Sequence, residues 1–254
     1  MKKLIVTLVA AVLCSWGFAQ TETQRVSDGL VVNPATPTTT TQATPTTKTK
    51  WLPTFKQVLV DGPMKIHFVR IPKAEGPHIV YDTKGCTTSK FTFLMDKNGV
   101  LNITERFDSK RITVTDVTIY YHVLENISIA RAEVSFDQPV NTPVIDVAFS
   151  EGAIADVQFD VRDLKMDVTG KCRIVLSGSA RYFDVAISTG KLEAGRMVSM
   201  SVDVNASHGA QVCVNATERL HAVTSSSGKV VYKGEPEIIR EHTSVFGGHI
   251  SQMQ

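Results

Sequence analysis

A repeat with a period of 19 residues runs from residue 145 to residue 247 and constrains the fold more than any other feature of the chain. When this segment is written in rows of 19, one column holds glycine in every row except one, where Lys171 follows Gly170. The glycines of this column are Gly152, Gly190, Gly209, Gly228 and Gly247. A fixed period of about 20 residues is typical of a solenoid, in which each repeat forms one coil.

Three further columns are apolar, and they stand two residues apart. Side chains at this spacing share one face of a β-strand, whereas a helix would need spacings of three and four. The columns read Ile145, Leu164, Phe183, Val202 and His221, then Val147, Met166, Val185, Val204 and Val223, then Phe149, Val168, Ile187, Ala206 and Ser225. The repeat therefore predicts an all-β fold, a parallel β-solenoid whose coils of about 19 residues stack about 4.8 Å apart.

The first 19 residues have the composition of a secretory signal peptide. Lys2 and Lys3 precede an apolar run over residues 4–13, and small residues lead to a cleavage site after Ala19. The run is shorter than the roughly 20 residues that span a bilayer, which argues against a membrane anchor. Cys14 would suit a lipoprotein signal, but the large Leu13 before it disfavours lipidation. We therefore expect export to the periplasm, the outer cell surface or the medium, with no transmembrane segment after cleavage.

Residues 20–50 are rich in threonine and proline. Nine of the fourteen residues from Thr36 to Thr49 are threonine, with Pro34, Pro37 and Pro45 nearby. Such a segment buries too little apolar surface to offset its ordering entropy, so we predict a disordered stalk over residues 20–50. Residues 51–254 are then one β-helix head domain, a length that is ample for a single core.

Charge and cysteine content narrow the classes of partner. Without Lys2 and Lys3 the 27 basic residues fall to 25 and equal the 25 acidic ones, so no basic field favours nucleic acid. Three cysteines remain after cleavage: Cys86, Cys172 and Cys213. The repeat places Cys172 and Cys213 two coils apart, beyond disulfide distance, and we expect free thiols with Cys172 buried. The sequence leaves open whether Cys86 pairs with one of them.

Five short segments together resemble the head GIN domain family, a group of adhesin-like exported proteins of Bacteroidetes-type bacteria. They are residues 60–66 (VDGPMKI), 99–103 (GVLNI), 124–129 (LENISI), 226–236 (SSGKVVYKGEP) and 245–251 (VFGGHIS). The resemblance covers roughly residues 55–251. It implies a right-handed parallel β-helix, similar in outline to that of pectate lyases, and a role in adhesion.

One column between the apolar ones carries charge: Asp146, Lys165, Asp184 and Asp203. On stacked coils these side chains would point outward about 5 Å apart. Asp184 and Asp203 could share a cation, or act as paired carboxylates on a sugar, since retaining glycosidases hold theirs about 5 Å apart. The simpler interpretation is a solvated ladder in which Lys165 bridges Asp146 and Asp184. We favour it because the sequence shows neither a cleft nor a cationic partner aimed at the acids.

A second polar column precedes the glycines and reads Ser150, Thr169, Ser188, Ser207 and Ser226. These hydroxyls could contact a glycan, but serine and threonine at turns more often satisfy backbone amides. The histidines show no spacing typical of metal ligands: His67, His78, His122, His208, His221, His242 and His249. We predict no catalytic residue, no cofactor and no metal, and the sequence assigns no ligand-binding residue. Trp51 and the pair Tyr120 and Tyr121 offer aromatic surface, with burial an equal alternative.

We therefore predict an exported, non-catalytic, adhesin-like module that contacts glycans or other surface polymers. The first alternative is a carbohydrate-active enzyme, a lyase or hydrolase, with Asp184 and Asp203 in its site. The second alternative is a structural protein that self-associates through the ends of its solenoid, where strand edges are unpaired.

Overall fold

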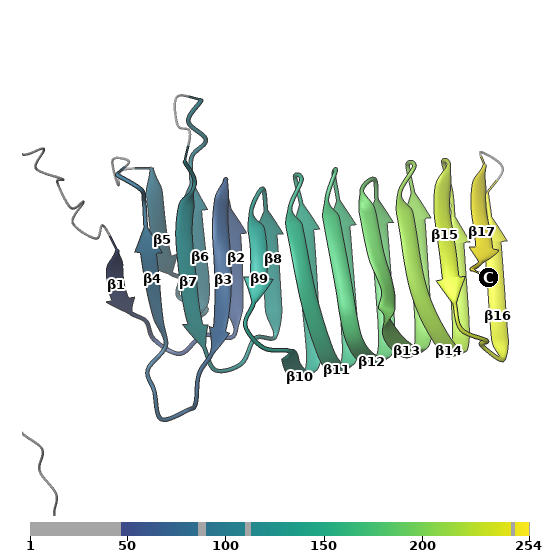
Figure 1. Ribbon diagram of the computed structural model, residues 1–254, viewed down its shortest axis with the longest axis horizontal. Coiled ribbons are helices and arrows are strands. Elements are labelled where there is room, and N and C mark those ends of the chain that lie inside the picture. The colour runs from purple at the N-terminus through teal and green to yellow at the C-terminus, as the bar shows by residue number, and fades with distance from the viewer. Residues whose placement is uncertain (1–46, 86–89, 110–112, 245–246, 254) are drawn as a thin grey trace, which may run out of the picture. The chain divides into compact units, whose positions relative to one another are not determined.

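The computed structural model describes residues 47–85, 90–109, 113–244 and 247–253, and these residues form one all-β domain. The chain winds into a β-solenoid of about seven turns, which confirms the fold predicted from the repeat. Figure 1 shows the strands of successive coils side by side along one axis, with tight turns aligned along one edge of the stack. Within the described ranges no helix is long and apolar enough to cross a bilayer.

Seventeen strands make up this domain, short in its first half and long in the repeat. The short strands are β1 (Lys48–Trp51), β2 (Gln57–Asp61), β3 (Met64–Arg70), β4 (His78–Asp82), β5 (Phe91–Met95), β6 (Val100–Glu105), β7 (Thr115–Tyr121), β8 (Asn126–Ala130) and β9 (Glu133–Phe136). The strands of the repeat and the last coil are β10 (Val140–Ser150), β11 (Ile154–Thr169), β12 (Arg173–Ser188), β13 (Lys191–Ser207), β14 (Gln211–Thr224), β15 (Gly228–Lys233), β16 (Ile238–Thr243) and β17 (Gly248–Gln252).

Strand β11 shows how one repeat becomes one coil. Its side chains alternate between buried and exposed, and the pairing with β12 is interrupted at Arg162. Residues 154–161 therefore belong to one face of the solenoid, which we call face A, and residues 163–169 belong to the other, face B. The inward side chains of both faces meet in a single apolar core that runs the length of the stack.

The glycine column forms the tight turns between face B of one coil and face A of the next. At residues 150–153 the amide of Ala153 donates to the carbonyl of Ser150 at 3.1 Å, and both central residues have positive φ. Gly190 also has no room for a side chain, since a Cβ there would lie 2.8 Å from the carbonyl oxygen of Gly170. Glycine is thus required at this position by backbone conformation and by close approach.

The regular 19-residue register fails in the last repeat, and part of the predicted column assignment is wrong there. The offset between β13 and β14 falls to 18, so that Val202 pairs with Leu220 and Asp203 pairs with His221. Leu220, Ala222 and Thr224 point into the core, where the fixed period had placed His221, Val223 and Ser225. Two irregularities in this pairing cause the slip: between Glu193 and Val198 β13 contains three residues more than β14, and directly afterwards β14 contains one more. The offset therefore falls from 20 residues at Lys191 to 18 at Val202.

The first half of the domain does not stack in chain order. On face B, β2 lies between β6 and β8, and on face A, β3 lies between β7 and β9. Antiparallel strands flank this end: β5 pairs with β6, β4 pairs with β7, and β1 pairs with β4. In the sequence, Asn98 and Gly99 stand between two segments of alternating apolar residues, which is typical of a hairpin or tight turn, and β5 and β6 form that hairpin. The sequence indicated neither the order of the other strands nor the antiparallel pairs of β4.

The other end of the solenoid is a coil built from β16 and β17. Strand β16 pairs with β14, β17 pairs with β15, and every residue of β16 is exposed. Ile239 and Glu241 pair with the buried Leu220 and Ala222, so they occupy the inward columns of a coil that nothing in the described residues covers.

Several predictions about the ends of the chain fall outside the described residues. The signal peptide over residues 1–19, most of the stalk over residues 20–50, and Cys86 lie there. The first described strand begins at Lys48, three residues before the predicted start of the head domain at Trp51. Cys172 and Cys213 are free, as the coil spacing predicts, and both are buried, which the sequence predicted for Cys172 alone.

Candidate functional site

The charged column lies on the outer side of face B, where the sequence placed it. Asp146 pairs with Lys165, Lys165 with Asp184, and Asp184 with Asp203, each on adjacent parallel strands. The structure extends the column by one residue that the fixed period had assigned to the core. His221 pairs with Asp203, and its Nδ1 lies 3.0 Å from Oδ2 of that carboxylate.

The electrostatics of this column are those of an exposed ladder. Partial burial and the neighbouring carboxylate of Asp203 raise the pKa of Asp184 above its usual value, and Lys165 offsets part of this effect. Lys165 makes no ion pair within 4.0 Å with Asp146 or Asp184, although all three residues are described. The predicted ion pairs of Lys165 with Asp146 and Asp184 are therefore not formed, and Lys165 affects Asp184 only by its charge at longer range.

The shape of the surface does not make Asp184 and Asp203 an enclosed acid pair. A furrow of about 200 Å³ borders the column at its other end, where Asp146, Lys165 and Asp167 contribute side chains. Both carboxylates of the proposed pair are exposed to solvent. A glycosidase holds one acid protonated near neutral pH by enclosing it, and the open sheet surface provides no such enclosure here.

The serine and threonine column forms the turns through its backbone. The carbonyls of Ser150, Ser207 and Ser225 accept the amides of the residues three positions later, at 3.1, 3.0 and 2.9 Å. Ser225, rather than the predicted Ser226, follows Ser207 in the column, because of the register slip. Where the structure records hydroxyl contacts they go elsewhere, as when Ser207 donates to the carbonyl of Ile187 at 3.4 Å. The interpretation that these hydroxyls accept hydrogen bonds from the turn amides is therefore wrong at these positions, because the backbone carbonyls accept them.

The histidines lie apart from one another on the surface. His67 contacts the hydroxyl of Ser135 at 2.9 Å, His122 contacts the carbonyl of Glu75 at 2.8 Å, and His208 lies between the Ser188 and Ser207 hydroxyls. Within the described ranges no three His, Cys, Asp or Glu side chains are grouped as they would be to hold a metal ion.

An aromatic stack lies on the outer side of face A near the start of the domain. The rings of Trp51 and His78 are 4.8 Å apart, and those of His78 and Tyr120 are stacked at 4.0 Å. The three residues stand on the adjacent strands β1, β4 and β7, in register. Trp51 is 72% exposed, whereas Tyr121 points inward and is buried. The sequence left open whether these aromatic residues are exposed or buried. Trp51 is exposed and Tyr121 is buried.

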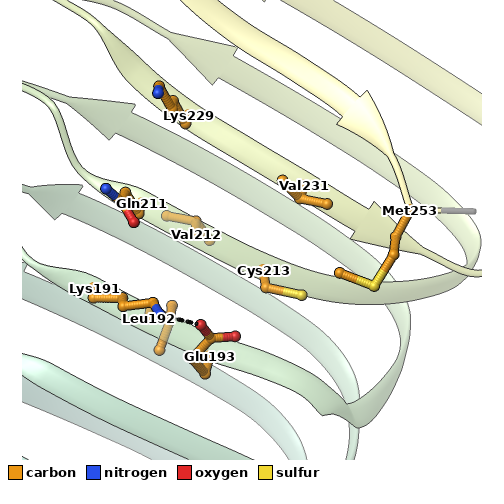
Figure 2. A pocket seen from close by; sticks show the side chains of 9 residues that line it. All are labelled: Lys191, Leu192, Glu193, Gln211, Val212, Cys213, Lys229, Val231 and Met253. Carbon is orange, nitrogen blue, oxygen red and sulfur yellow. Dashed lines mark ion pairs between the residues drawn. The ribbon is translucent and has the colours of Figure 1, made fainter.

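A furrow of about 270 Å³ lies on the outer side of face A near the other end of the domain (Figure 2). We call it the basic furrow. It is formed by β13, β14, β15 and the residue after β17, and its lining includes Lys191, Glu193, Gln211, Cys213, Lys229, Val231 and Met253.

The sequence did not reveal this furrow, because its basic column does not keep the 19-residue period. Arg173, Lys191, Gln211, Lys229 and His249 pair in that order on successive strands. Their spacings alternate between 18 and 20 residues, so a search that allowed one residue of slack would have found the column.

Solved structures with the same fold come from Bacteroides and Parabacteroides. A structure described as a putative adhesin from Bacteroides fragilis has a TM-score of 0.72 and 18% identity, covering 82% of this chain and 96% of its own. A putative adhesin from Parabacteroides merdae has a TM-score of 0.65 and 15% identity, covering 82% and 95%. A protein from Parabacteroides distasonis, described as a putative lipid binding protein, has a TM-score of 0.62 and 15% identity, covering 82% and 96%. At these identities the likeness shows the fold.

No curated protein matches the sequence. The family model described as "Putative auto-transporter adhesin, head GIN domain" matches residues 55–236, which include the face B column, the aromatic stack from His78 onward and most of the basic furrow. The match spans most of the domain, and it agrees with the resemblance carried by the short sequence segments. The chain belongs to the head GIN domain family of adhesin-like proteins.

Proposed function

We propose that the protein is an exported adhesin-like module that binds glycans and catalyses no reaction. The family and the similar structures support a binding role, because their descriptions refer to adhesion or to lipid binding. Export is supported by the composition of the first 19 residues. The open, ordered outer faces suit contact with an extended polymer more than enclosure of a small substrate.

The observation that carries the glycan proposal is the aromatic stack of Trp51, His78 and Tyr120. An exposed indole on a sheet surface is a large, flat and rigid apolar plate. The faces of sugar rings that bear only C–H groups can lie against such a plate, and ring nitrogens at its edge can bond the hydroxyls. His78 supports the indole of Trp51, because its ring packs against both Trp51 and Tyr120.

The test is retention of the purified protein on an array of neutral and charged polysaccharides, with release of new sugar ends measured in the same wells. Trp51→Ala should weaken glycan binding about tenfold or more, as loss of a central aromatic anchor does. Phe107→Ala is the matched control, since Phe107 is equally exposed and lies in the loop after β6. Equal binding by both variants would contradict the assignment to Trp51, and release of sugar ends would contradict the non-catalytic role.

A further inference from the structure

The floor of the basic furrow is apolar. Cys213 is only 9% exposed, and Figure 2 shows the thioether of Met253 reaching towards its thiol beside Val231. Gly195 makes this arrangement possible, because a Cβ at that position would lie 2.9 Å from the Cys213 sulfur. The floor therefore offers sulfur and methyl groups to a ligand, with Cys213 buried and Met253 exposed above it.

Cations stand on both sides of this floor. Lys191 and Lys229 belong to the basic column on one side, and the stem of Lys233 crosses the Gly195 position from the other, within 3.4–3.6 Å of a Cβ placed there. Lys191 is paired with Glu193 at 2.8 Å, as the dashed line in Figure 2 shows. Lys229 and Lys233 have no ion-pair partner in the part of the chain that the structure describes. Lys229 in the lining of the furrow and Lys233 beside it are thus two positive charges without an ion-pair partner among the described residues.

The basic column continues beyond the furrow in both directions along the solenoid axis. Arg173 precedes Lys191 and His249 follows Lys229, each on the next strand and about 4.8 Å away. A small anion would engage one of these positions. A linear polyanion that ran along the axis could engage several in succession.

We infer that the basic furrow binds an acidic polysaccharide, a chain of sugars that carry carboxylate or sulfate groups. The inference rests on the proposed glycan-binding function and names the class of glycan and a second site for it. The apolar face of one sugar ring lies over Cys213, Val231 and Met253. Anionic groups of the chain pair with Lys229 on one side of the ring and with Lys233 on the other, and hydroxyls of the ring bond Gln211 and Glu193.

The composition of the furrow disfavours two other polyanionic partners. Single-stranded nucleic acid is held by aromatic side chains that stack on bases, and the nine lining residues include none. An anionic membrane attracts clustered lysines by surface potential alone and needs no recessed apolar floor or hydrogen-bonding side chains between the cations. The alternation of Lys, Gln and Lys with Glu193 alongside suits a ligand that carries both charges and hydroxyls.

The experiment compares three ligands: polygalacturonate, the same polymer after its carboxyls are reduced to alcohols, and phosphatidylglycerol vesicles. Binding to the full chain is measured by titration calorimetry at low and moderate salt. The variants are Lys229→Gln and Lys233→Gln, singly and combined, Trp51→Ala, and Lys97→Gln in the turn between β5 and β6 as the control for the loss of one charge. Thermal unfolding verifies that each variant folds, which is expected because both furrow lysines lie on the surface.

The inference predicts that polygalacturonate binds, that its reduced form binds at least tenfold more weakly, and that added salt weakens binding. The double lysine variant should lose about tenfold or more in affinity, at roughly three- to tenfold for each lost charged hydrogen bond, and Lys97→Gln should lose nothing.

Three outcomes overturn the inference: no binding of polygalacturonate, equal binding by the double lysine variant, or a stronger dependence on these lysines with vesicles than with the polymer. The two proposals fail separately. If neutral glycans bind through Trp51 but polygalacturonate does not bind, only the furrow inference is lost. If polygalacturonate binds through the lysines and Trp51→Ala changes nothing, only the aromatic site is lost.

Discussion

Asp184 lies between a cation and an anion in the face B column, and partial burial adds to the effect of Asp203. Both raise the pKa of its carboxyl above the usual 3.8. When the pKa of a group is higher in the folded than in the unfolded state, protonation of the group stabilises the fold. This stabilisation is complete below the unfolded pKa and is lost as the pH rises through the folded pKa. The ionised Asp184 therefore disfavours folding at neutral pH.

We expect Asp184→Asn to raise the free energy of unfolding at pH 7, because it removes this penalty. The gain should be below about 1 kcal/mol, since the group is exposed and screened. Urea titrations at pH 7 and pH 3 provide the measurement. The difference between the variant and the original protein should vanish at pH 3, where Asp184 is protonated in both states. A difference that persisted at pH 3 would show that the amide acts through packing rather than charge.

At the scale of single elements, the repeat predicted the strands β10 to β13 and the turns between them, and it failed at β14. The period identifies inward positions only while each coil keeps the same number of residues. Irregularities in the pairing of β13 with β14 change the offset between them from 20 to 18 residues, and a sequence pattern that assumes a constant period has no means of showing where this happens. The basic column was missed for the same reason, whereas the face B column was found because it keeps the 19-residue spacing from Asp146 to Asp203.

The register of β14 has a direct test in two neighbouring residues. Leu220→Ala should destabilise the protein by about 2–5 kcal/mol, because it empties a fully buried position. His221→Ala should cost less than about 1 kcal/mol, because it removes one exposed contact with Asp203. Chemical denaturation of the two variants measures both values. The reverse order of costs would restore the uninterrupted 19-residue register.

The turn glycines offer a matched pair that separates two causes of their presence. Gly209 has a φ of 75° and open space around its Cβ position, so Gly209→Ala should cost only the conformational penalty of about 1 kcal/mol. Gly190 has a φ of 91° and backbone oxygens within 3 Å of that position, so Gly190→Ala should cost clearly more. Equal losses in denaturation experiments would mean that the coil relaxes around the added methyl group.

For the whole molecule, the two ends of the solenoid differ. One end finishes in the antiparallel strands β1 and β5, while the other presents a parallel coil with Ile238 and Ile239 about half exposed. The ends therefore do not match as successive coils, and an end-to-end filament is not expected. Glu241 projects into the inward column of the open coil, where a charge opposes pairing with another chain.

Glu241→Val should increase self-association, because it replaces a charge beside Ile239 with an apolar side chain. The inward positions 239 and 241 of β16 are then both apolar. Two identical ends that meet form a closed pair, so the product should be a dimer and no larger species. Sedimentation velocity over a range of concentrations measures this. Glu237→Val, in the loop before β16, is the control with the same change of charge and apolar surface. Filaments, or equal association of the control, would contradict this view of the end.

The position of β2 and β3 between later strands sets the order in which the chain can fold. Residue 57 pairs with residues 100 and 126, so the first segments of the domain to be synthesised gain partners on both sides only after more than a third of it exists. Until then their apolar side chains, such as Val58, Val60 and Phe68, lack the strands that cover them in the native state. Each later coil, in contrast, needs only the coil before it in the chain to pair with. Strands β2 and β3 are therefore completed only together with β6 to β9. We expect these six strands to form one folding unit, to which the coils of the repeat are added in chain order.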